Sequence, residues 1–183
     1  MKHARTAMFG LFLIVVSGLV SATTIIPLSV EQLAGKSSQV LRGHATQSWT
    51  AWNPQHTLIY TYTKFQITKS LKGAPEQMVT VKQIGGRVGN TVQKVAGVRH
   101  FTPGEEDVLF LQPSKDHDGT MIVTGLTQGN FQLRRVDTGK VVASNGVPEV
   151  SSLEVGTGAI SNYRGSAMTV DELESRIRKV VQQ

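Results

Sequence analysis

The chain has 183 residues and no cysteine, which excludes disulfide bonds and a lipid anchor attached through a cysteine thiol. Its 19 basic and 13 acidic residues give a formal net charge of +6, a mild excess without a Lys/Arg cluster of the kind that marks nucleic-acid binding. We therefore expect no nucleic acid among its partners.

The first 22 residues have the layout of a secretory signal peptide. Lys2 and Arg5 give a positive start, residues 7–20 form an uncharged and largely apolar run, and residues 20–22 supply short side chains at the usual cleavage positions. The run is shorter than the roughly 20 apolar residues of a membrane-spanning helix. We expect cleavage near Thr23, a mature protein in the periplasm or outside the cell, and no transmembrane segment after cleavage. An uncleaved anchor is the alternative.

Residues 23–183 are predicted to form a single β-rich domain. Removing residues 1–22, which hold two of the basic residues, leaves 161 residues with 17 basic against 13 acidic side chains, a net charge of +4. This length suffices for one hydrophobic core. Without disulfides, an exported domain must be stabilised by that core alone. Long loops are expected over residues 85–104 and 145–168.

A short helix is predicted first in the mature chain, over residues 30–34. Ser29 precedes it as an N-cap, and Gln32 stands where it completes a capping box. Gly35 is expected to end the helix, because glycine readily adopts the conformation that follows a last turn.

The clearest strand covers residues 57–71, where β-branched and aromatic side chains line both faces. A strand of this length usually bends around a barrel or carries a bulge. Residues 77–84 are expected to be its antiparallel partner. Upstream, residues 38–48 alternate loosely as another strand, and residues 49–54 are interpreted as a turn that carries two tryptophans.

Shorter elements are predicted in the second half of the chain. Residues 85–104 hold five glycines without a steady period, which indicates a long loop, with at most a short strand near residues 92–95. Four short strands separated by turns follow, over residues 107–111, 120–125, 130–136 and 141–143. Residues 145–165 show no convincing element.

An amphipathic helix is predicted at the carboxyl end. Thr169 is its N-cap, and Glu172 occupies the capping-box position. One apolar stripe recurs at helical spacing, formed by Val170, Leu173, Ile177 and Val180.

This pattern of short strands, one long strand and few helices indicates a small closed β structure. Residues 60–73 (YTYTKFQITKSLKG), 79–86 (VTVKQIGG) and 101–113 (FTPGEEDVLFLQP) resemble a set of uncharacterised secreted bacterial β-proteins and, more distantly, the netrin-like domains related to tissue inhibitors of metalloproteinases. The resemblance covers roughly residues 29–135 and implies an OB-type β-barrel. Netrin-like domains are usually tied by disulfides, and their inhibitors chelate the protease metal with an amino-terminal cysteine. This chain lacks both, so the resemblance implies no functional residue.

Aromatic side chains form the first candidate binding site. Trp49, Trp52, Tyr60 and Tyr62 lie close together in sequence, and Tyr60 and Tyr62 share one face of the predicted strand. OB-type barrels often bind polymers by stacking on such faces. Core packing is the alternative, because aromatic residues usually bury their rings. Arg87 and His100, in the glycine-rich segment, are the second candidates.

Catalytic and metal chemistry find weaker support. Asp116, His117 and Asp118 share one turn, but the twelfth residue from Asp116 is Thr127 rather than the Glu of a calcium loop. No G-x-S-x-G motif marks a nucleophile. The glycines at residues 85–89 precede strand-like residues rather than the helix of a phosphate site. We expect no catalytic residue, metal or cofactor.

The leading functional hypothesis is a non-enzymatic binding or interaction module whose partner is an extracytoplasmic protein or polymer. Two alternatives come from other classes. One is an inhibitor or partner of a secreted protease that acts through a loop. The other is a hydrolase with an unrecognised site.

Overall fold

The structure is a computed structural model that describes residues 24–73, 77–145, 151–153, 160–162 and 165–182. The signal peptide expected over residues 1–22 lies outside this part of the chain. Within it the protein is mainly β, as predicted. Neither helix of these residues combines the length and apolar character required to cross a bilayer.

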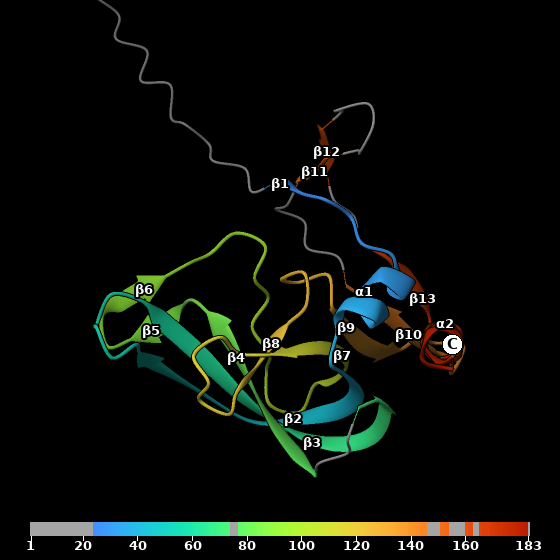
Figure 1. The fold of residues 1–183 in the computed structure, drawn as a ribbon, viewed down its shortest axis with the longest axis horizontal. Coiled ribbons are helices and arrows are strands. Elements are labelled where there is room, and N and C mark those ends of the chain that lie inside the picture. The colour runs from blue at the N-terminus through green and yellow to red at the C-terminus, as the bar shows by residue number, and fades with distance from the viewer. Residues whose placement is uncertain (1–23, 74–76, 146–150, 154–159, 163–164, 183) are drawn as a thin grey trace, which may run out of the picture.

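The described residues contain two helices and thirteen strands (Figure 1). The helices are α1 (Val30–Lys36) and α2 (Val170–Val181). The strands are β1 (Thr24–Ile25), β2 (Gln39–Trp52), β3 (Ile59–Lys72), β4 (Met78–Ile84), β5 (Gly86–Val88), β6 (Thr91–Gln93), β7 (Glu106–Pro113), β8 (Met121–Val123), β9 (Asn130–Arg135), β10 (Val141–Ser144), β11 (Ser151–Leu153), β12 (Ile160–Asn162) and β13 (Ala167–Thr169).

Five strands pair in a closed ring. β2 pairs with β3, β3 with β4, β4 with β8, β8 with β7, and β7 again with β2. All these pairs are antiparallel except β4–β8, which is parallel and joined only at Val81 and Met121. β9, β10 and β13 continue the sheet outward from β7. The expected antiparallel pairing of the long strand with its successor is confirmed as β3–β4.

β2 and β3 form a long bent ribbon of 14 residues each, and their pairing shifts register at three places. The predicted bulge is therefore present. The predicted turn at residues 49–54 is wrong, because Trp49 and Trp52 lie in β2 and pair with Tyr62 and Ile59 of β3. Cross-strand pairing of aromatic and β-branched residues extends the strand to this point. The turn begins at Asn53, whose Oδ1 accepts hydrogen bonds from the Thr57 and Leu58 amides just before β3.

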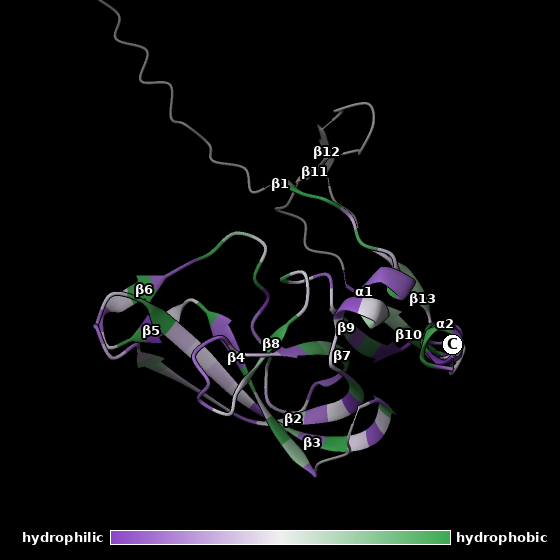
Figure 2. Cartoon of the chain, viewed as in Figure 1, coloured by the Kyte–Doolittle hydropathy of each residue, from purple (hydrophilic) through white to green (hydrophobic). Residues whose placement is uncertain are grey.

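Two hydrophobic cores lie on opposite sides of β2 and β7, whose residues alternate between them. Figure 2 shows the hydropathy of each residue along these strands. The ring core lies inside the ring and includes Leu41, Phe65 and Leu109. The helix core lies between the sheet and the two helices and includes Val40 and Phe110 among its buried residues. Successive side chains of a strand point to opposite faces, so two strands contribute to both cores.

The glycine-rich segment over residues 85–104 is more ordered than expected. It opens with the antiparallel hairpin β5–β6, and β6 at Thr91–Gln93 partly confirms the short strand considered near residues 92–95. The chain then returns to the ring of strands, where Phe101 is buried in the ring core. The phenyl groups of Phe101 and Phe65 meet in a T-shaped arrangement, with 4.8 Å between their centroids. Tertiary packing of one aromatic ring therefore anchors a segment that has no periodic pattern of its own.

The helix predictions are largely confirmed. The Ser29–Gln32 capping box is present in α1, and Thr169 Oγ1 accepts a hydrogen bond from the Glu172 amide in α2. Gly35 does not end α1, which continues to Lys36. The helix ends there because Ser37 adopts an extended conformation, with φ −90° and ψ 140°, while its amide and hydroxyl both donate to the Leu33 carbonyl.

The prediction of no element over residues 145–165 is wrong where the structure describes this segment. β11 and β12 pair there with each other, and β11 also pairs in parallel with β1. Long-range pairing with the amino-terminal strand forms this small sheet, and a local pattern does not reveal such pairing. The rest of this segment, residues 146–150, 154–159 and 163–164, lies outside the described residues.

Candidate functional site

A row of aromatic and basic side chains crosses the outer surface of β2, β3 and β4. We call this row the aromatic face; it consists of Trp49, Tyr60, Tyr62, Lys64 and Lys82. The alternate residues of β3 are buried, so the pleat leaves its two tyrosines and Lys64 on the outer side. Trp49 and Lys82 lie opposite Tyr62 on the two neighbouring strands, which aligns the three side chains across the sheet.

The rings of the aromatic face stack and alternate with lysines. Trp49 lies against Tyr62 at 5.5 Å between centroids and an interplanar angle of 13°, and Tyr60 lies 6.5 Å from Tyr62. The Lys82 ammonium is 4.5 Å from the Tyr60 centroid, and the Lys64 ammonium is 5.9 Å from that of Trp49, both within cation–π range. Trp49 keeps 37% of its surface exposed despite these contacts. A large aromatic residue is thus accessible at the edge of an ordered stack.

Lys82 is held in place by two carboxylates from the loop between β7 and β8. Its ammonium donates to Asp116 at 2.5 Å and to Asp118 at 2.9 Å, while only 7% of its side chain is exposed. Burial lowers the pKa of this lysine, but the hydrogen bonds to Asp116 and Asp118 outweigh burial and hold the pKa above its ordinary value. Hydrogen bonding from Thr120, and then from Lys82, lowers the pKa of Asp118 to about 2. The ammonium is therefore charged and oriented at neutral pH.

The carboxylates of this loop thus bind the Lys82 ammonium. Within the described ranges, no group of three or more His, Asp and Glu side chains is arranged to bind a metal ion. Asp116 and Asp118, which the sequence places in a calcium-like turn, both point to Lys82 instead. The turn shape comes from the backbone, with positive φ angles at His117 and Gly119.

A pocket of about 360 Å³ adjoins the aromatic face where β4 and β8 diverge. The two strands pair only at Val81 and Met121, so the end of β4 beyond Val81 separates from β8. Tyr60 and Lys82 belong to both the aromatic face and the pocket lining, which makes the two surfaces continuous.

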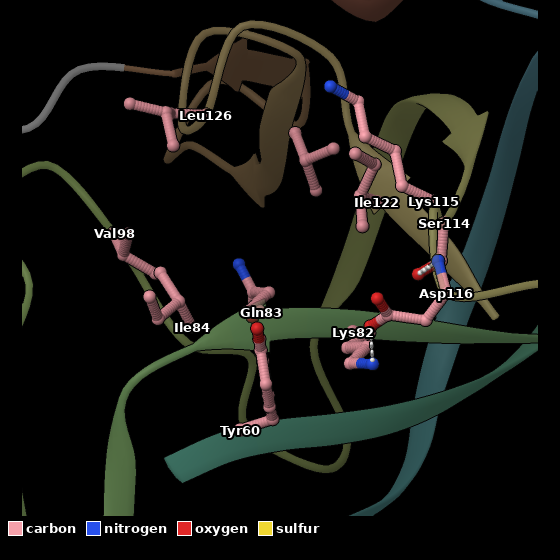
Figure 3. Close-up of a pocket in the computed structure, with 11 residues that line it drawn as sticks. Tyr60, Lys82, Gln83, Ile84, Val98, Ser114, Lys115, Asp116, Ile122 and Leu126 are labelled. Carbon is pink, nitrogen blue, oxygen red and sulfur yellow. Dashed lines mark hydrogen bonds and ion pairs between the residues drawn. The ribbon is translucent and has the colours of Figure 1, made fainter. Parts of the chain in front are cut away.

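The pocket has mainly aliphatic walls and a few polar groups. In Figure 3, Ile84 and Val98 lie on one side, Lys82 and Asp116 on the other, and Leu126 lies opposite Tyr60. Ile122 and Val123 of β8 also line it. A concave, mostly apolar pocket with a few oriented polar groups has the usual character of a ligand site.

Gln83 is the most informative polar residue of the pocket. Only 8% of it is exposed, and its Nε2 donates to the Arg99 carbonyl at 2.8 Å. This bond fixes the orientation of the amide, because the reverse assignment would bring two oxygens together. Its Oε1 is buried and has no hydrogen-bond partner among the described residues. Gln83 therefore lines the pocket, but its free acceptor is enclosed by the protein.

A partly buried cluster of charged and polar side chains fixes the segment that forms the Val98 side of the pocket. The Arg99 guanidinium donates to Asp107 at 2.5 Å, to Glu105 at 2.8 Å and to Asn130 at 2.8 Å. Asp107 is fully buried, and burial raises its pKa to about 7 even though the Arg99 charge opposes this change. Arg99 therefore links the loop to β7 and β9.

The other sequence candidates occupy separate places. Trp52 lies on the face of β2 opposite to that of Trp49 and stacks on His56 at 6.1 Å. Arg87 has an exposed side chain in β5, and its carbonyl accepts a hydrogen bond from Thr50. His100 Nε2 lies 3.1 Å from the Ile84 carbonyl oxygen, so His100 contacts the backbone of a pocket residue without lining the pocket itself. The structure thus brings together Trp49, Tyr60 and Tyr62, but not these three residues.

Sequence reasoning missed Lys64, Lys82, Gln83 and the aspartates that hold Lys82. Lys82 and Lys64 had a usable signal, since alternation along two paired strands places both on the face of Tyr62. Gln83 and Asp116 had none, because their roles depend on residues far away in sequence.

Comparison with known proteins supplies no relative: the sequence matches no protein-family model and no curated protein. An assignment of function therefore depends on the chemistry of the aromatic face and the pocket.

Proposed function

We propose that this protein is a non-enzymatic binding module that works outside the cytoplasm and captures an extended protein segment or polymer on its aromatic face. The observation that carries this proposal is the continuity between an ordered, accessible aromatic stack and a mostly apolar pocket, which share Tyr60 and Lys82. A row of rings along one face of the sheet suits an elongated ligand, because successive units can each contact one ring.

We also propose that the ring of strands is an OB-type barrel. In the partly open five-stranded OB barrel, ligands bind on the second and third strands and on the loops that join strands one to two and four to five. Counting along the ring strands, β3 and β4 are second and third, and the β7–β8 loop that carries Asp116 joins the fourth to the fifth. The positions of the aromatic face and the pocket therefore support both parts of the proposal.

The test is a fluorescence titration of the mature, exported protein. Trp49 and Trp52 are its only tryptophans, and both lie in β2, so their emission reports directly on this region. The probes are a panel of soluble glycans and a phage-displayed library of random peptides. We expect Trp49→Ala to weaken binding of the best probe at least tenfold, because the exposed ring is lost, while its melting temperature changes by no more than about 2 °C, as for a surface position.

The matched control is Val136→Ala, which trims an exposed apolar residue beyond β9, outside the aromatic face. It should bind the probe as the parent protein does. Failure of every glycan and peptide to bind, or equal affinity of the Trp49→Ala variant, would contradict the proposed function.

A further inference from the structure

The pocket beside Gln83 places two demands on an occupant. About 360 Å³ is near the lower end of ligand-pocket volumes, enough for one large apolar side chain with its peptide group. The aliphatic walls favour an apolar group.

A peptide meets these demands better than a sugar does. A large apolar side chain of a peptide can fill the aliphatic space without bringing a polar group into it. A sugar ring would bring several hydroxyl groups against Ile84, Val98 and Ile122, where they would lose water without gaining partners.

Charge distinguishes the two ends of the site. At the pocket, Lys82 and Lys115 are balanced by Asp116 and Asp118, so this end is close to neutral. At the other end, Lys64 lies beside Trp49 and forms no ion pair within the described part of the chain. An acidic ligand group is therefore favoured at Lys64 but not at the pocket.

The spacing between the two ends follows from strand geometry. Tyr60 at the pocket and Lys64 are four residues apart on the same face of β3, which corresponds to about 13 Å at ~3.3 Å per residue. An extended peptide running beside β3 covers this distance in about four residues.

We infer that the site recognises an extended peptide whose large apolar side chain enters the pocket and whose acidic side chain, about four residues away, contacts Lys64. This inference rests on the proposed function and specifies its ligand. The aromatic rings of Trp49 and Tyr62 contact the residues between the two anchors.

Selection from the phage-displayed peptide library tests the inference. Peptides bound by the parent protein should share an apolar residue and an Asp or Glu about four positions from it. With Lys64→Glu as bait, the acidic position should change to Lys or Arg, because the charge it faces is reversed. Lys94→Glu, at an exposed lysine outside the aromatic face, is the matched control and should select the same pattern as the parent.

Pocket variants test the second anchor with a selected peptide. Ile122→Trp fills the pocket and should weaken binding at least tenfold. Leu126→Asp places a charge at an exposed lining position and should have the same effect if Ile122→Trp does not fold. Melting curves verify that each variant is folded.

The outcomes separate the inference from the proposed function. Binding of glycans but not peptides, or unaltered peptide binding by folded pocket variants alongside a loss in Trp49→Ala, overturns the inference and leaves the proposed function intact. An unchanged peptide pattern with Lys64→Glu overturns it as well. Absence of binding to every probe overturns both.

Discussion

At the scale of single residues, Asp107 shows how burial and charge compete. The carboxyl group is fully buried and hydrogen-bonded to Arg99, yet its second oxygen, Oδ2, has no partner among the described residues. Burial raises its pKa to about 7, Arg99 acts in the opposite direction, and the nearby Glu105 adds to the increase. The residue is thus poised to titrate in the neutral range.

This pKa predicts an unusual dependence of stability on pH. The folded protein holds a proton on Asp107 up to about pH 7, whereas the unfolded chain loses it near the ordinary value of 3.8. Between these values the folded state binds more protons, so the free energy of unfolding decreases as the pH rises towards 7. We expect the melting temperature to fall between pH 5 and pH 8 by at least about 2–4 °C, which corresponds to roughly 1 kcal/mol.

The matched variant is Asp107→Asn, which keeps a similar shape and cannot titrate. Its melting temperature should vary much less over the same pH range, measured by thermal denaturation. A parent and a variant with equal slopes would contradict the assignment. The range ends at pH 5 because Glu31, whose pKa the Arg176 hydrogen bond lowers to about 2, contributes stability that is lost at lower pH.

At the scale of elements, two glycines with different surroundings illustrate what the backbone requires. Gly43 lies at a register shift of the β2–β3 ribbon, where an added Cβ would come within 2.7 Å of the Gln66 carbonyl oxygen. Gly35 lies in α1, where an added Cβ would meet nothing within 4 Å. At Gly43 the two strands can approach closely only because there is no side chain. At Gly35 there is room for one.

The same substitution should therefore have opposite effects at the two sites. Gly43→Ala is expected to destabilise the protein by about 1–3 kcal/mol, because the strands must move apart. Gly35→Ala is expected to stabilise it by about 0.5–1 kcal/mol, because alanine favours the helix and restricts the unfolded chain. Urea denaturation measures both, and a change of the same sign in both variants would count against this account.

At the scale of the whole molecule, β2 and β7 connect the two cores. Phe101 belongs to the ring core and Leu173 to the helix core, and both cores pack against these shared strands. Loss of either core would expose apolar residues of the strands on which the other depends. The two cores are therefore expected to unfold together.

Truncation on either side tests this coupling. Phe101→Ala and Leu173→Ala should each cost about 2–5 kcal/mol, as large-to-small changes in a core do. Each variant should unfold in one transition that coincides by tryptophan fluorescence, which reports on the ring, and by far-ultraviolet circular dichroism. A Leu173→Ala variant that loses helix while the tryptophan transition is unchanged would indicate separate folding units.

The sequence by itself determined the features that depend on neighbouring residues. The two-faced strand, its antiparallel partner and both helix caps were predictable, because alternation along a strand and capping act over a few positions. The stacking of Trp49 on Tyr62 was predictable only in part, since the turn expected at residues 49–54 concealed that Trp49 and Trp52 face opposite ways.

Only the tertiary structure decided the closure of the ring, the packing of the glycine-rich segment and the pocket. Lys82 meets its carboxylates across 34 and 36 residues of sequence, and Gln83 lines a pocket that adjoins the place where β8 leaves β4 after a single pairing. Such features arise where segments distant in sequence meet. The free energy that selects them comes from burial and pairing between those segments, which no local pattern records.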